Sequence, residues 1–208
     1  MTSAIAKPPG APPMVLTVSF DVNQVRDRVN WNFCDTRATT EDPLRGDWHN
    51  DIRFQPGQTF QIELHVYGLQ HPLQDDLEGI HVVDCCLITL PQIKECGRDR
   101  HTKYHSPSPF APATYGPSTP RGALVSIPGQ DFSKSDSVSG SIFNDPSYGA
   151  EVPLVLKWSN TLTVGDELAH WDLSFYVTIE LKRKKNGRHY RVFYFDPESE
   201  VTTGLDPP

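Results

Sequence analysis

The sequence predicts an all-β fold, an antiparallel two-sheet β-sandwich of about seven or more strands with long loops. Three observations lead to this prediction. Apolar and polar residues alternate with period two in several segments, Pro- and Gly-containing turn signals separate these segments, and no segment of the 208 residues has a clear helical period. A domain of this length buries a sizeable core without disulfides.

The N-terminal half contains three predicted strands and one long loop. Residues 16–22 alternate between apolar and polar side chains, so we expect one buried face. Residues 26–46 are polar and irregular, and we expect a loop there. Residues 60–67 alternate again behind the turn signal Pro56-Gly57. Residues 80–90 form a nearly continuous apolar run, which is typical of a central strand buried on both faces.

The C-terminal half contains a second long loop and four more predicted strands. Residues 93–122 are rich in Pro, Ser and Tyr, and their prolines exclude a helix or a central strand. Short apolar runs at 123–127 and 152–158 predict two strands. Residues 173–182 alternate with period two, and 188–195 form the return strand of a hairpin.

The last hairpin has a strong turn signal. Asn186-Gly187 predicts a two-residue type I′ turn, which fixes the register of the strands that flank it. Leu181 then faces Val192 on the core side. Phe193 and Phe195 fall on the other face, so we expect another subunit or a loop to cover them.

Domain boundaries follow from these elements. We expect a flexible leader at 1–13, a single β-sandwich domain at 14–202 and a short tail at 203–208. The leader is rich in Ala and Pro and has no apolar core of a signal peptide, so we expect a cytoplasmic protein with reduced cysteines. No segment has the roughly 18 to 20 apolar residues that a membrane span needs.

The charge distribution bears on partners. The formal net charge is −7, which gives no general attraction to the phosphates of nucleic acid. Six basic residues nevertheless gather between Lys182 and Arg191, so the remainder of the chain is more acidic than the whole. This basic tip is either a solvated end that keeps a sheet edge unpaired, an anion-contacting finger, or a complement to acidic surface on an identical subunit.

Two aromatic segments suggest a sugar site. Trp31 and Trp48 each stand near Asn and Asp, and a flat ring beside amide and carboxylate groups suits stacking on a sugar and hydrogen bonding to its hydroxyls. The alternative is a Trp folded back onto the sandwich, with Asn and Asp supplying turn chemistry. The candidate residues for sugar binding are Trp31, Asp35, Asp47, Trp48, Asn50 and Asp51.

A Cys/His string suggests a metal site. Cys96, His101 and His105 have histidine spacing that suits zinc, although the cysteines upstream are not spaced like zinc ligands. The alternative is a set of solvent-exposed loop histidines, and we expect no cofactor. The sequence contains neither a nucleophile-elbow motif nor a phosphate-binding loop, so an enzyme, of hydrolase type, is the third choice.

The two ends of the chain carry a family resemblance. The strand Val15–Val22, a strand led by Trp171, and the ending Phe193–Pro197 followed by Glu200-Val201 resemble the bacterial inclusion-body family named after PixA and AidA. The resemblance implies a small cytosolic β-sandwich without a signal peptide, accumulated in stationary phase or under quorum control and tied to host association. It supplies no catalytic motif.

Together these features predict a non-enzymatic protein whose main partner is itself, as a homo-oligomer. A carbohydrate-binding, lectin-like module is the alternative. Neither nucleic acid nor a membrane is an expected partner.

Overall fold

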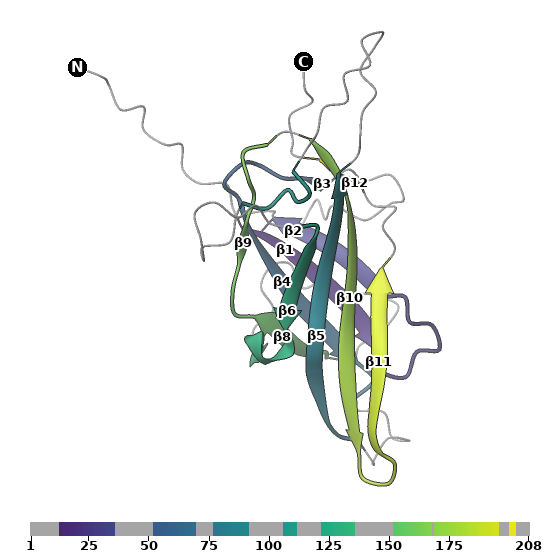
Figure 1. Ribbon diagram of the computed structural model, residues 1–208. Coiled ribbons are helices and arrows are strands. Elements are labelled where there is room, and N and C mark those ends of the chain that lie inside the picture. The colour runs from purple at the N-terminus through teal and green to yellow at the C-terminus, as the bar shows by residue number, and fades with distance from the viewer. Residues whose placement is uncertain are drawn as a thin grey trace, which may run out of the picture.

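The structure, a computed structural model, describes residues 13–35, 52–69, 77–91, 106–111, 122–135, 152–167, 169–195 and 200–202. These residues form two β-sheets that pack face to face, and they contain no α-helix (Figure 1). The prediction of an all-β two-sheet sandwich is therefore confirmed. Within these ranges no helix is long and apolar enough to cross a membrane.

The first sheet has six strands. Its strand order is β2-β1-β4-β8-β7, and β9 pairs with β4 beyond the end of β8. The strands are β1 (Met14–Asp21), β2 (Asn30–Asp35), β4 (Thr59–Tyr67), β7 (Phe132–Ser135), β8 (Leu154–Trp158) and β9 (Leu162–Thr163).

The second sheet also has six strands. Its order is β3-β12-β10-β5-β6. The remaining strand, β11, pairs with the C-terminal part of β10, on the edge of β10 that does not pair with β5. The strands are β3 (Ile52–Arg53), β5 (Leu77–Pro91), β6 (Leu124–Pro128), β10 (His170–Arg183), β11 (Gly187–Phe195) and β12 (Glu200–Thr202). A short 3₁₀ turn, η2 (Gly129–Asp131), follows β6 and leads the chain to β7 in the first sheet.

Most neighbouring strands are antiparallel, as predicted, but two pairs are parallel. β1 runs parallel to β4, and β12 runs parallel to β3. The first pair arises because the chain leaves the first sheet after β2, contributes β3 to the second sheet, and only then returns beside β1. A parallel pair needs such a crossover, whereas an antiparallel pair can be joined by a tight turn.

Aromatic side chains from both sheets fill the space between them. Phe20 of β1 stacks on Phe193 of β11 with ring centroids 4.3 Å apart, and Phe175 stacks on Phe195 at 5.4 Å. Phe54 and Phe60 pack edge to face at one end of the same cluster. Most of the buried apolar residues of the described chain form one continuous core, which holds the two sheets in contact.

The β10–β11 hairpin has a different register from the predicted one. Arg183 pairs with Gly187 around a three-residue turn, and Gly187 adopts a φ of 73°, as expected for a type I turn closed by a glycine bulge. Leu181 pairs with His189 instead of Val192, so the register differs by three residues, and an odd shift exchanges the two faces of the strand. Phe193 and Phe195 are 0% and 2% exposed in the core, so the prediction that they lie on the outer face is wrong.

Two other predictions need correction. Residues 30–35, placed in a loop by their polar composition, form β2 because Trp31 and Phe33 alternate with Asn30 and Asn32 against β1. The run at 80–90 is not buried on both faces, since Leu90 is 49% exposed on the outer face of the second sheet.

Candidate interaction surface

The predicted sugar-binding residues are only partly within the described chain. Asp47, Trp48, Asn50 and Asp51 lie outside it, and of Asp35 only the backbone is described, as the last residue of β2. Trp31 is half-buried and packs against Phe33 and Phe195, with ring centroids 5.6 and 5.3 Å away. Its ring thus contributes to the end of the core, in line with the alternative that the sequence left open for this residue.

The predicted metal ligands Cys96, His101 and His105 lie outside the described residues. Among the residues that are described, no three His, Cys, Asp or Glu side chains are grouped closely enough to hold a metal ion. Cys85 and Cys86 are free thiols on opposite faces of β5, and burial raises the pKa of the Cys85 thiol well above its usual value. Cys85 therefore serves as a small apolar core residue rather than as a nucleophile.

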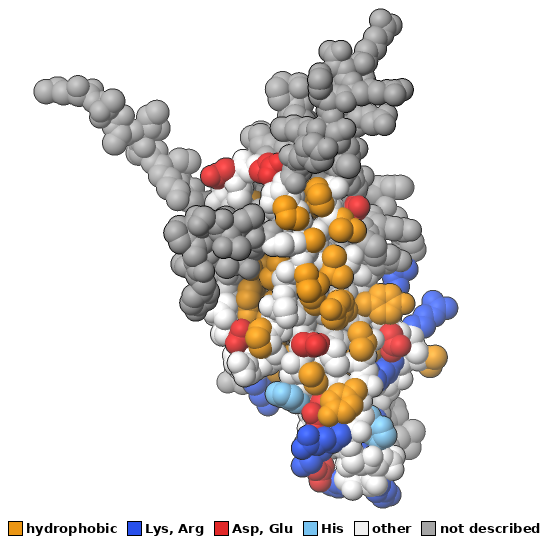
Figure 2. Space-filling model, viewed as in Figure 1, with side chains coloured by type: hydrophobic (Ala, Val, Ile, Leu, Met, Phe, Trp, Pro, Cys, Tyr) orange, Lys and Arg blue, Asp and Glu red, His pale blue; other side chains and the backbone are white. Residues whose placement is uncertain are grey.

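Exposed apolar side chains gather on the second sheet. Eight large hydrophobic residues are exposed in the described chain, and six of them lie on β5, β6 and β11 (Figure 2). We call these six the outer patch: Val83, Leu90, Leu124, Tyr190, Val192 and Tyr194. Surface apolar residues scattered singly need no explanation, but a contiguous group marks a site of interaction.

The strand register shows why these residues share one face. Tyr194 lies opposite Tyr176 of β10, which in turn lies opposite Cys86 of β5. The hydroxyl of Tyr176 hydrogen-bonds with Cys86, which joins the aromatic residues of β10 and β11 to β5. Tyr176 and Cys86 thus lie between the outer-patch residues of β11 and those of β5.

The hairpin end of this sheet is basic. Lys182 pairs with Glu78 at 2.9 Å, and Arg188 pairs with Glu180 at 3.1 Å. The hydrogen bond from Lys182 lowers the pKa of Glu78. Basic side chains still outnumber these two carboxylates, so the tip carries net positive charge (Figure 2); they are Lys182, Arg183, Lys184, Lys185 and Arg188.

The opposite end of the sheet is acidic. Asp166 and Glu167 lie a few residues before β10, and Asp172 lies near its start. The carboxylate of Glu167 accepts a hydrogen bond from the backbone N–H of Ser106 at 2.9 Å. The face of the second sheet therefore carries negative charge at one end of β10 and positive charge at the other, with the outer patch between them.

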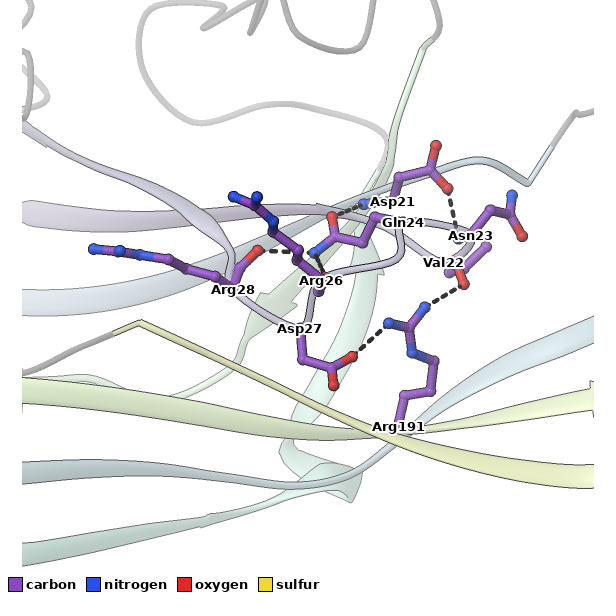
Figure 3. Close-up of polar contacts among 8 residues, drawn as sticks. All are labelled: Asp21, Val22, Asn23, Gln24, Arg26, Asp27, Arg28 and Arg191. Atoms are coloured by element: carbon purple, nitrogen blue, oxygen red, sulfur yellow. Dashed lines mark hydrogen bonds and ion pairs between the residues drawn. The ribbon is translucent and has the colours of Figure 1, made fainter.

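The loop that follows β1 limits the free edge of β11. The guanidinium of Arg191 donates a 3.0 Å hydrogen bond to the carbonyl of Val22 and pairs with the carboxylate of Asp27 (Figure 3). The backbone of this loop then runs beside β11. The N–H of Tyr194 donates to the carbonyl of Asp27, and the N–H of Val29 donates to the carbonyl of Tyr194, both at 2.9 Å. This loop covers the edge of β11 at Tyr194.

Side chains within the loop hold its shape. The amide of Gln24 donates to the carbonyls of Arg26 and Arg28, at 2.5 and 2.8 Å, and accepts from the N–H of Asp21 (Figure 3). These contacts close the loop on itself before it meets β11. The sequence contained no recognised signal for this loop, since none of its contacts has a fixed spacing in the chain.

The first sheet has a buried charge cluster that the sequence did not predict. Glu63 of β4 is fully buried, and its carboxylate lies 3.1 Å from the ammonium of Lys157 and 3.6 Å from the ring of His65. The alternation at 60–67 correctly separates these polar residues from the core face, but Glu63 and His65 are also buried. Removing one partner from such a pair is strongly destabilising, so we regard the cluster as structural.

Comparison with known proteins gives no relative. The chain matches no protein-family model, no curated protein and no solved structure. The geometry described above is therefore the basis on which a function is proposed.

Proposed function

We propose that this protein is a non-enzymatic, self-associating β-sandwich protein, in which the outer patch of one chain packs against that of a second copy. The observation that carries the proposal is the concentration of six of the eight exposed large hydrophobic residues on one sheet. Aromatic residues are enriched in the contact regions of protein interfaces, and they make up three of seven residues when Tyr176 is counted with the outer patch.

The charge distribution favours a second copy as the occupant. A two-fold axis that reverses the strand direction would place the basic tip of each chain over the acidic start of β10 in the other. Asp172 and Arg183 are 11 positions apart on β10, or on the order of 35 Å for an extended strand. Complementary charges at both ends would align the chains, while the outer patch would supply most of the affinity.

The resemblance of the terminal strands to the PixA/AidA inclusion-body family supports the same proposal. Proteins of that kind accumulate as assemblies in the bacterial cytosol, and we extend the cytosolic location to this chain on that basis. The free thiols of Cys85 and Cys86 agree with a reducing compartment.

The proposal is tested by placing a charge in the outer patch. Leu90→Lys should weaken self-association by about tenfold or more, because it buries an ammonium in the contact without disturbing the core. Leu90 lies opposite Asp172 on β10, so the new ammonium has a carboxylate neighbour in the isolated chain. Sedimentation equilibrium over a range of concentrations measures the effect.

Val152→Lys is the matched control. Val152 is 75% exposed and precedes β8 in the other sheet, so this change adds the same charge away from the outer patch. We expect it to leave the association constant unchanged. A wild-type chain that remains monomeric at high concentration would contradict the proposal, as would equal effects of the two substitutions.

A further inference from the structure

Beside the outer patch, β11 exposes a row of backbone hydrogen-bonding groups. Tyr194 directs its N–H and C=O away from β10 and towards Asp27 and Val29. Backbone groups alternate in direction along an antiparallel strand, so Val192, Tyr190 and Arg188 direct theirs to the same side. No strand of the described chain pairs with this edge between Arg188 and Val192, which leaves three N–H and three C=O groups along it.

The length of this open edge is fixed at both ends. At one end the Asp21–Val29 loop occupies the edge at Tyr194 and is held there by Arg191 (Figure 3). At the other end the chain turns at residues 184–186. The open stretch therefore accepts an extended segment of about five residues, the length at which one added strand makes a full set of edge hydrogen bonds.

Both ends of the open edge are positively charged. The hairpin tip carries five basic residues against the carboxylates of Glu78 and Glu180, and Arg26 and Arg28 flank Asp27 at the loop end. Two identical edges that pair antiparallel would bring the tip of one chain against the Arg26–Arg28 loop of the other. Like charges would then meet at both ends, which disfavours a second copy on this edge.

We infer that the open edge of β11, from Arg188 to Val192, adds an extended, acidic segment of another protein as a further strand. The N–H and C=O groups of Arg188, Tyr190 and Val192 would pair with the backbone of the segment. Acidic side chains of the segment would lie near the basic residues at the ends of the edge. Apolar side chains on alternate positions would lie beside Tyr190 and Val192, which are 59% and 49% exposed.

This contact is distinct from the self-association proposed above. The outer patch faces away from the sheet, whereas the edge groups point along the plane of the sheet. Both contacts use Tyr190, Val192 and the basic tip, but Leu90 belongs to the self-association contact alone, so Leu90→Lys is expected to affect only that contact.

The experiment uses a short synthetic peptide of alternating glutamate and valine, with blocked ends, and a lysine–valine peptide as its charge control. Amide hydrogen exchange of the full chain is followed by NMR. The glutamate–valine peptide should slow exchange at the amides of Tyr190 and Val192 by about tenfold or more, since each becomes hydrogen-bonded. The amide of Phe193, which points to β10, should keep its exchange rate.

Two variants at one position isolate the backbone contribution. Val192→Pro removes an N–H that points to the open edge and leaves the hydrogen bonds with β10 in place, so it should weaken peptide affinity by about tenfold. Val192→Thr retains the N–H and the branched side chain and should bind nearly as well as the wild type. If Val192→Pro does not fold, the exchange pattern of the wild-type chain decides the question alone.

The outcomes separate this inference from the proposed function. No binding of the glutamate–valine peptide at millimolar concentration overturns the inference, and so does equal binding of the lysine–valine peptide. Protection of Tyr190 and Val192 that rises with protein concentration and without peptide overturns it in favour of a second copy on the edge. Peptide binding that persists in Leu90→Lys supports it, whatever that variant does to self-association.

Discussion

At the scale of single residues, neighbours along β11 have opposite roles. Phe193 is fully buried, stacks on Phe20, and has the guanidinium of Arg191 4.6 Å from its ring centroid. Tyr194, the next residue, is 48% exposed and belongs to the outer patch. Phe193 thus contributes to the stability of the fold, whereas Tyr194 contributes to the interaction surface. Substituting each residue in turn can distinguish these two roles.

Truncating each ring should give different losses of stability. Phe193→Ala should lower the free energy of unfolding by about 3 to 5 kcal/mol, because it removes a buried ring and leaves a cavity. Tyr194→Ala removes a half-exposed ring and should cost no more than about 1 kcal/mol. Urea denaturation followed by circular dichroism measures both.

The comparison tests the register of the hairpin directly. In the register that the sequence predicts, Phe193 would lie on the outer face and Tyr194 on the core face. The order of the two losses would then be reversed. Similar losses for both variants would mean that both faces of β11 are covered to the same extent.

At the scale of the element, the sequence predicts strands better than it predicts their partners. The alternation at 16–22, 60–67 and 173–182 reflects a buried face, which is a local property, and all three segments coincide with strands to within one residue. The parallel pairing of β1 with β4 depends on the path of the chain through the other sheet. No local pattern encodes that path.

The hairpin error has a physical cause in its turn. Asn-Gly suits a two-residue type I′ turn, but a glycine with positive φ can also close a three-residue turn with a bulge. The sequence Lys184-Lys185-Asn186-Gly187 satisfies both, and the packing of Phe193 and Phe195 in the core decides between them. The outer patch could not be predicted for the same reason, since its members in β11 depend on this register.

The predicted sugar site illustrates another limit on what the sequence pattern can predict. Composition singled out Trp31 because it stands beside Asn32, but alternation with Phe33 turns its ring towards the core. Conversely, Glu63 and His65 occupy polar positions of a clear alternation and are buried even so. Burial of an outer face depends on distant parts of the chain, so periodicity cannot report it.

The connection from β6 to β7 gives a prediction at the element scale. The 3₁₀ turn η2 begins at Gly129, where an added Cβ would lie 1.8 Å from the backbone oxygen of Val82. Val82 belongs to β5, whose pairing with β10 is irregular next to it. Gly129→Ala must therefore displace either the turn or β5, and we expect a loss of at least about 2 kcal/mol in the free energy of unfolding.

Gly79→Ala, on the same strand β5, is the control. No heavy atom lies within 4 Å of a Cβ added at Gly79, so this variant should be neutral or slightly stabilising. Thermal unfolding of both variants measures the difference. Equal melting temperatures would show that the approach of Gly129 to Val82 imposes no constraint.

At the scale of the whole molecule, the separation of charge links stability to assembly. The chain has a net charge of −7, yet one end of the second sheet is basic. Charges of opposite sign at the two ends of β10 contribute little to the stability of one chain, because the strand keeps them on the order of 35 Å apart. In the proposed antiparallel dimer the basic tip of each chain would contact the acidic end of β10 in the other chain. The charge separation would then stabilise the dimer rather than the single chain.

The dimer should therefore weaken as the ionic strength rises. Between about 0.05 M and about 1 M NaCl the Debye length falls to about 3 Å, so attraction between the basic tip and the acidic end is screened. Lys185→Glu should weaken self-association at low salt and reduce its dependence on salt. Lys134→Glu makes the same change in net charge on β7, in the other sheet, and should preserve both properties. A dissociation constant that falls steadily with added salt would exclude charge pairing and leave the outer patch as the whole basis of association.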